Sequence, residues 1–152
     1  MARIFGTVLI LAGCAGFLYK WAEGEKARQR MAEEWIRLFV RWGYALEQEH
    51  VRLYDFLSFY ETADASMQTF LDEVCVCMRN HQNPSGQKIW QDCLQKHKSK
   101  LQIGQEGWEI LTSAAGAFYG ESSAENLRCN EICRKRMEKF LAESRLEFFK
   151  KQ

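Results

Sequence analysis

A single proline, Pro84, interrupts the 152-residue chain, so long stretches on both sides of it are free to form helices. Glu, Lys, Gln, Leu, Ala and Arg are plentiful, while Val, Ile and Thr are sparse, and this balance favours helix over strand. Hydrophobic residues make up 47% of the chain and aromatic residues 13%, which is too apolar for a disordered protein. We therefore predict an all-α fold.

An uncharged run of 16 residues, Ile4–Tyr19, stands between Arg3 and Lys20. As a helix it is about 24 Å long, slightly short for a bilayer, but Tyr19 and Trp21 suit the headgroup zone and Lys20 can snorkel. We therefore predict a transmembrane anchor at residues 1–21, followed by a domain at 22–152. The side chains expected to face lipid are Ile4, Phe5, Val8, Leu9, Ile10, Leu11, Phe17, Leu18 and Tyr19.

Basic residues are more frequent after the anchor than before it, and the positive-inside rule then places the domain in the cytoplasm of a single-pass membrane protein. An alternative is open at the same place. Leu11-Ala12-Gly13-Cys14 has the form of a lipobox, which would make the chain an exported lipoprotein with a helical domain, lipidated at Cys14.

Residues 22–152 are enough for one compact core of roughly 130 residues and not for two. Helical spacing of apolar residues, interrupted by turn signals, predicts about five helices that pack as one antiparallel bundle. The expected helices cover 22–60, 64–80, 86–97, 108–118 and 123 to near the end of the chain, with connections at 83–86 and 101–107.

Capping residues set the expected helix ends. Asp64 or Thr62 caps the second helix, and Ser122 or Ser123 caps the last one, with Glu125 spaced for a capping box. Gly120 ends the preceding helix because glycine tolerates a positive φ.

Six cysteines and three histidines invite a metal or redox interpretation, but their spacing does not support one. Cys75 and Cys77 point roughly 200° apart on a helix, so they cannot hold one ion together. Cys129 and Cys133 share a helix face, and a metal or redox role for these two cysteines with a histidine stays open as an alternative. His81 and His97 each end a helix, where a capping role is expected.

No Walker loop, G-x-S-x-G, H-E-x-x-H or dinucleotide fingerprint occurs in the sequence. The net charge of +1 favours neither a nucleic acid nor an acidic partner. The expected protein is therefore not an enzyme, and it has no cofactor, no metal, no nucleic-acid partner and no small-molecule substrate.

A series of short motifs follows the anchor in a characteristic order. These are Leu46-Glu47-Gln48-Glu49, Leu53-Tyr54-Asp55-Phe56-Leu57, Phe70-Leu71-Asp72-Glu73-Val74, Ile89-Trp90-Gln91-Asp92-Cys93-Leu94, Phe118-Tyr119-Gly120-Glu121-Ser122 and Glu125-Asn126-Leu127. In this order the chain resembles the stage III sporulation protein AB family over nearly its whole length.

The resemblance implies a helical bundle similar to the cytoplasmic domains of type II secretion F proteins. It also implies a non-enzymatic membrane scaffold that lies in the outer forespore membrane, with its domain on the mother-cell side. There it would be part of the complex that joins mother cell and forespore. The stage III sporulation AA ATPase and the other channel-complex subunits are the implied partners. Residues expected to contact that ATPase flank the turn after the fourth helix: Tyr119, Gly120, Glu121 and Ser122.

The chain departs from the family pattern at a few positions. Arg52 stands where the family often has proline, Ser123 where it has aspartate, and Asn126 where it has glutamine. The family usually ends in a second transmembrane helix, whereas this sequence stops after Phe148-Phe149-Lys150-Lys151-Gln152. A truncated chain and a one-anchor variant are both compatible with that ending.

Overall fold

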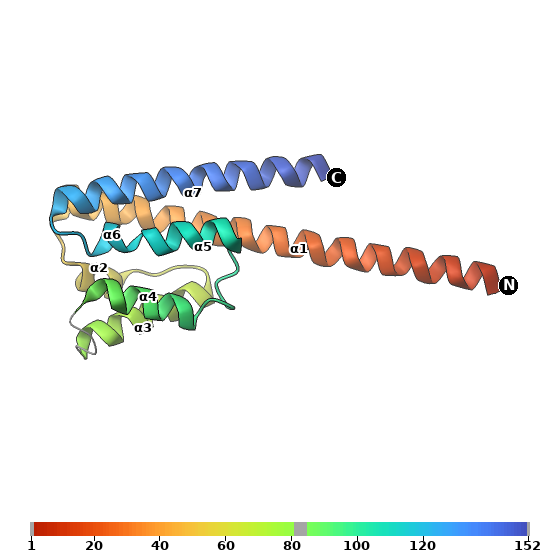
Figure 1. The fold of residues 1–152 in the computed structure, drawn as a ribbon, viewed down its shortest axis with the longest axis horizontal. Helices are drawn as coiled ribbons and strands as arrows, with labels where there is room; N and C mark the ends of the chain where they lie inside the picture. Colours follow the sequence, from red (N-terminus) through yellow and green to blue (C-terminus); the bar gives the residue numbers. More distant parts are fainter. Residues whose placement is uncertain (1, 81–84, 152) are drawn as a thin grey trace.

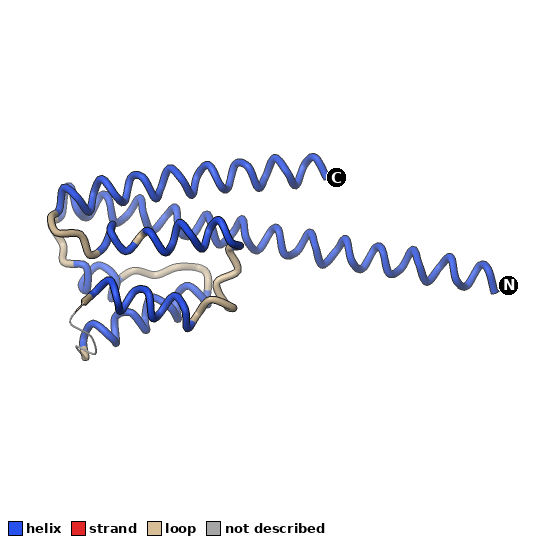
Figure 2. The backbone as a smooth tube through the Cα atoms, viewed as in Figure 1, coloured by secondary structure: helices blue, strands red, loops and turns tan. Residues whose placement is uncertain are grey.

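The computed structural model describes residues 2–80 and 85–151, and all regular structure within these ranges is helical, which confirms the predicted fold class. The elements are α1 (Ala2–Tyr44), the π-helical turn η1 (Ala45–Glu49), α2 (Leu53–Phe59), α3 (Ala65–Arg79), α4 (Gly86–Lys96), α5 (Gly104–Ser113), α6 (Ala115–Phe118) and α7 (Ser123–Lys151). Figure 2 shows these helices joined by short loops.

The two longest helices, α1 and α7, lie side by side and run in opposite directions (Figure 1). The α5–α6 segment packs beside α7, and the α3–α4 pair forms a second layer with α2. The N-terminal half of α1 extends well beyond the other helices, and both described ends of the chain lie toward the same end of the domain.

Aromatic side chains fill the space between the two layers. Trp35 of α1 meets Phe70 of α3 and Trp90 of α4 edge to face, with ring centroids 5.9 and 6.0 Å apart. Trp90 also packs against Phe118 of α6, at 4.8 Å. All four side chains are buried, so one aromatic cluster joins four helices.

The long helix expected at 22–60 is interrupted, and that prediction was wrong in its second half. After Tyr44 the helix widens into η1, which ends when the amide of His50 donates to the carbonyl of Ala45 at 2.8 Å. His50 has φ of 53°, an uncommon conformation for a residue other than glycine. The chain then reverses, so that Phe56 of α2 packs on Trp42, at 5.0 Å.

Three of the expected helices were located correctly, and their caps follow the sequence signals. The side chain of Asp64 accepts from the amide of Met67 at 2.9 Å, and that of Ser122 accepts from the amide of Glu125 at 3.1 Å. Ser85 caps α4, whereas Asn83 and Pro84 of the expected turn lie outside the described residues.

The helix expected at 108–118 begins earlier and is divided. It starts at Gly104, whose φ of 82° favours glycine, and Ala114 separates α5 from α6. Gly120 has a different role from the one predicted, since Gly104 is the only described glycine with a positive φ. A Cβ at Gly120 would instead overlap the side chain of Asn126, whose oxygen accepts from the Gly120 amide at 2.6 Å.

Candidate membrane-facing and partner-binding surfaces

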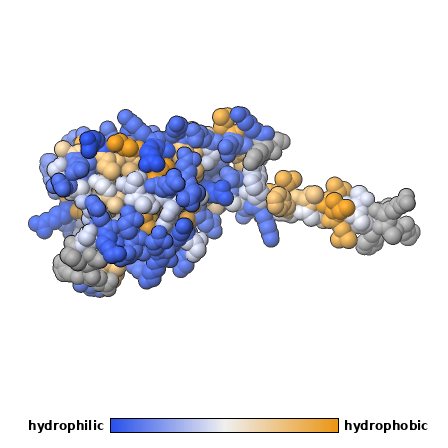
Figure 3. Space-filling view, viewed as in Figure 1, coloured by the Kyte–Doolittle hydropathy of each residue, from blue (hydrophilic) through white to orange (hydrophobic). Residues whose placement is uncertain are grey.

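The N-terminal half of α1 is an exposed apolar rod. Every described side chain from Gly6 to Lys20 is exposed, and Figure 3 shows apolar residues along this projecting segment. Val8 is 58% exposed and Phe17 is 71% exposed. The predicted anchor residues that lie in this segment are Val8, Leu9, Ile10, Leu11, Phe17, Leu18 and Tyr19.

The apolar surface surrounds the helix instead of forming one stripe. Val8 to Leu11 are consecutive, and steps of about 100° distribute their side chains around the whole axis. A helix that docks in a protein groove needs only one apolar face, whereas lipid contacts every face. The side chains of Ile4 and Phe5 lie outside the described part of the chain.

No helix in the part of the chain that the structure describes combines the length and the apolar character needed to cross a bilayer.

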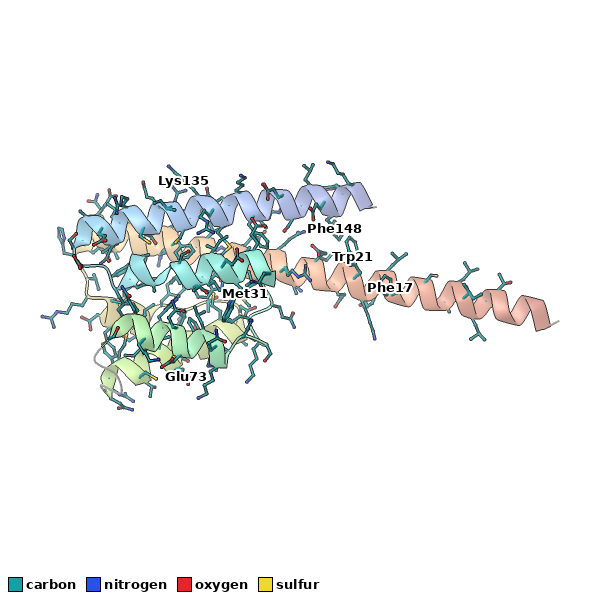
Figure 4. The ribbon with its side chains drawn as sticks, in the orientation of Figure 1. Phe17, Trp21, Met31, Glu73, Lys135 and Phe148 are labelled. Carbon is teal, nitrogen blue, oxygen red and sulfur yellow. The ribbon has the colours of Figure 1, made fainter. Side chains whose placement is uncertain are left out.

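The base of the rod is joined to the end of α7. Trp21 stacks on Phe148 with ring centroids 5.7 Å apart and the planes within 6° of parallel, and Figure 4 shows the two side chains pointing toward each other. Phe149, the next residue of α7, is 73% exposed. The base of the rod therefore lies against apolar residues at the C-terminal end of α7.

The turn predicted to contact a partner is mostly occupied within the domain. Tyr119 turns inward: its ring packs where a Cβ on Gly86 would otherwise lie, and its hydroxyl donates to the Met78 sulfur at 3.3 Å. Burial raises the pKa of this hydroxyl. Glu121 and Ser122 are exposed, and Ser122 caps α7. The turn therefore presents these two side chains fully, whereas Tyr119 is only partly exposed.

A second surface, which sequence reasoning missed, lies where α1 passes the end of α2. Phe59 is 85% exposed, and Val40 faces the same open hollow. The side chains around this hollow are Ile36, Arg37, Val40, Arg41, Phe59, Tyr60 and Glu61, which we call the α1–α2 surface. Phe59 comes shortly after the apolar residues that were expected to be buried in the helix at 22–60. Helical periodicity alone therefore could not predict that Phe59 is exposed.

The cysteine pair of α7 is packed within the domain. The Cys129 thiol points at the carbonyl of Ser113, at 3.7 Å, and burial is the main reason that the pKa of Cys133 rises to about 12. The two described histidines lie elsewhere, because His50 follows η1 and the His97 ring contacts Glu73. In the part of the chain that the structure describes, no histidine joins Cys129 and Cys133 in a group that could hold a metal ion, and His81 lies outside it.

A family model described as stage III sporulation protein AB matches residues 3–152, almost the entire chain. Comparisons with curated proteins and with solved structures gave no match.

Proposed function

Because the chain belongs to the stage III sporulation protein AB family, we propose that it is a non-enzymatic, membrane-anchored scaffold of the sporulation stage III A complex that docks a cytoplasmic ATPase. The observation that carries this proposal is the apolar rod, which is exposed on all sides and continues without a break into the helical domain. In this proposal the rod is a single-pass helix in the outer forespore membrane, and its short uncharged run of 16 residues is accommodated by local thinning of the bilayer and by snorkelling of Lys20.

Charge at the base of the rod supports a cytoplasmic position for the domain. Lys20 ends the uncharged run, and Lys26, Arg28 and Arg30 follow within ten residues of it. Positive charge near the end of a transmembrane helix is retained on the cytoplasmic side. The stacked Trp21 and Phe148 would then lie at the interface, where aromatic rings are enriched.

Membrane attachment is tested by placing a charge in the rod. We expect Leu9→Arg to move the protein from the membrane fraction to the soluble fraction, since a central arginine costs about 2.5–3.5 kcal/mol on insertion scales. Val40→Arg is the matched control, because Val40 is similarly exposed but lies on the domain, and it should stay with the membrane. Equal fractionation of both variants would contradict the anchor.

The same preparation separates the anchor from the lipoprotein alternative. Intact mass spectrometry of the membrane-bound protein should show an uncleaved N-terminus. Loss of residues 1–13 with a lipid on Cys14, whose thiol is free and exposed, would establish the exported lipoprotein instead.

We further propose that the ATPase docks on the α1–α2 surface. Exposed Phe59 and Val40 supply apolar contact, and Arg41 and Glu61 line the same hollow, while Arg37 is already paired with Glu34 at 2.9 Å. This surface suits a mainly apolar segment of the ATPase. The turn at Tyr119–Ser122 offers a partner fewer free groups than the α1–α2 surface does. Tyr119 contacts Met78 within the domain, and the Gly120 amide donates to Asn126.

Capture of the stage III sporulation AA ATPase by the full chain in detergent tests this surface. We expect Phe59→Ser with Val40→Ser to weaken capture roughly tenfold or more, as loss of a central apolar contact does in other interfaces. Glu121→Ala should have little effect. The opposite order, with Glu121→Ala the damaging change, would return the contact to the predicted turn.

A further inference from the structure

Four side chains with metal-binding atoms meet between α3 and α4. Glu73 and Cys77 are one turn apart on α3, and Cys93 of α4 is one turn before His97, which caps the C-terminal end of that helix. Glu73 contacts His97, and the sulfurs of Cys77 and Cys93 lie within 4.8 Å of each other, as the antiparallel packing of α3 and α4 allows. Figure 4 shows Glu73 in this layer of the domain, away from the apolar rod.

Three of the four residues already hold their ligand atoms close together. A carboxylate oxygen of Glu73 and the sulfurs of Cys77 and Cys93 all lie within 4.8 Å of one another. Zinc binds thiolate at about 2.3 Å, which in a tetrahedral site places two sulfurs roughly 3.8 Å apart. Small side-chain adjustments are therefore enough to bring these atoms onto one ion.

Glu73 is held in place by the end of α4. Lys96 donates to one of its carboxylate oxygens at 2.6 Å, and the Nε2 atom of His97 contacts the other. The His97 side chain is only 7% exposed, and its Nδ1 atom is buried with no hydrogen-bond partner among the described residues. Each carboxylate oxygen has two lone pairs, so Glu73 keeps acceptor capacity for a cation.

The donor set selects the kind of metal. Thiolate ligands suit zinc, whereas magnesium and calcium prefer sites built from oxygen alone. Two thiolates and one carboxylate carry three negative charges, which Zn²⁺ and the Lys96 ammonium would balance. Cys93 is buried while Glu73 and Cys77 are partly exposed, so the site is sheltered but open to an entering ion.

We propose that Glu73, Cys77 and Cys93 bind a zinc ion that clips α3 to α4, with His97 as a positioning residue that orients the Glu73 carboxylate. On binding, each thiol gives its proton to solvent and its sulfur forms a bond to zinc, with no change of oxidation state. The fourth ligand position is filled by water. This proposal is independent of the membrane and docking proposals, since it uses neither the rod nor the α1–α2 surface.

Cobalt reports such a site directly. The full chain is purified in detergent, reduced, freed of metal and titrated with Co²⁺. We expect thiolate-to-cobalt charge-transfer absorption that saturates at one ion per chain. Addition of Zn²⁺ should abolish this absorption. Cys77→Ser with Cys93→Ser should remove the absorption. Cys129→Ser with Cys133→Ser is the matched control, because it removes another neighbouring thiol pair, and it should leave the spectrum unchanged.

The positioning role of His97 has its own measurement. His97→Ala should weaken Zn²⁺ binding by about 10–100-fold, the usual cost of losing an outer-shell partner. It should keep the charge-transfer absorption at saturation. His97→Gln should restore much of the affinity, because its amide can still donate to Glu73.

A measurement on the unaltered protein guards against variants that fail to fold. Zn²⁺ should slow alkylation of Cys77, mapped by mass spectrometry, and leave Cys75 unaffected, since Cys75 is a partly exposed thiol on the same helix. The proposal would be overturned if the unaltered chain showed no cobalt absorption, or if the variant without Cys77 and Cys93 retained it. It would also be overturned if a Cys77–Cys93 disulfide formed equally fast with and without Zn²⁺.

Discussion

Trp90→Ala should destabilise the domain by about 3–5 kcal/mol, measured as a lower urea midpoint with an unchanged slope. Trp90 is fully buried, and its ring lies 4.8 Å from Phe118 and 5.1 Å from Phe70. Its indole N–H also donates to the carbonyl of Leu111 at 2.8 Å. Alanine therefore removes these ring contacts and leaves the Leu111 carbonyl with only the longer hydrogen bond from the Ala114 amide, at 3.2 Å.

Trp108 provides the control for this substitution. Its ring lies at the surface under the Lys98 ammonium, 5.0 Å from it, and it is only partly buried. We expect Trp108→Ala to cost less than about 1.5 kcal/mol, because little cavity is left behind. Similar losses from both substitutions would mean that the aromatic cluster is not the centre of the core.

Gly43→Ala should cost about 1–3 kcal/mol, although alanine is the better helix former. A Cβ at Gly43 would lie 2.9 Å from the side-chain nitrogen of Asn130. Asn130 is almost fully buried in α7, and the same nitrogen donates to the carbonyl of Phe39 at 2.8 Å. The added methyl would displace the one side-chain hydrogen bond that joins α7 to the backbone of α1 in the described residues.

A double-mutant cycle separates this clash from other effects of alanine. Asn130→Ala alone loses the hydrogen bond, and the double variant Gly43→Ala with Asn130→Ala should cost less than the sum of the two single changes. Gly24→Ala is the control, since nothing lies within 4 Å of a Cβ there and alanine should stabilise α1 slightly. Strict additivity would contradict the proposed clash.

Much of the fold could be predicted because helical periodicity and caps are local signals. The stripe Met67, Phe70, Leu71 and Val74 is buried as expected, and Asp64 caps α3. The break after Tyr44 was missed although Gly43 stands next to it, because a single glycine within a helical pattern is tolerated and does not by itself end a helix. It is fixed by tertiary contacts, in particular the packing of Phe56 on Trp42, and these bring together residues that no local pattern relates.

Which side chains come together from different helices could not be predicted, for the same physical reason. Cys129 and Cys133 drew attention because they lie one turn apart on one helix. The side chains that actually come together are Glu73 and Cys77 of α3 with Cys93 and His97 at the end of α4. Glu73 and His97 are 24 residues apart in sequence, so no local pattern relates them. The partial burial of Tyr119 could not be predicted from its turn position, because the room for its ring is left by Gly86, which is 33 residues away in sequence.

The unbroken course of α1 has a mechanical consequence. One helix carries both the exposed apolar rod and the core residues Trp35 and Trp42, so no hinge separates them. Trp42 lies about 33 Å along the axis from Lys20. Turning the rod about its axis by one residue would rotate the domain by about 100°. Because the helix is continuous, the rotation of the rod about its axis fixes the orientation of the domain. It therefore also sets the direction in which the α1–α2 surface faces.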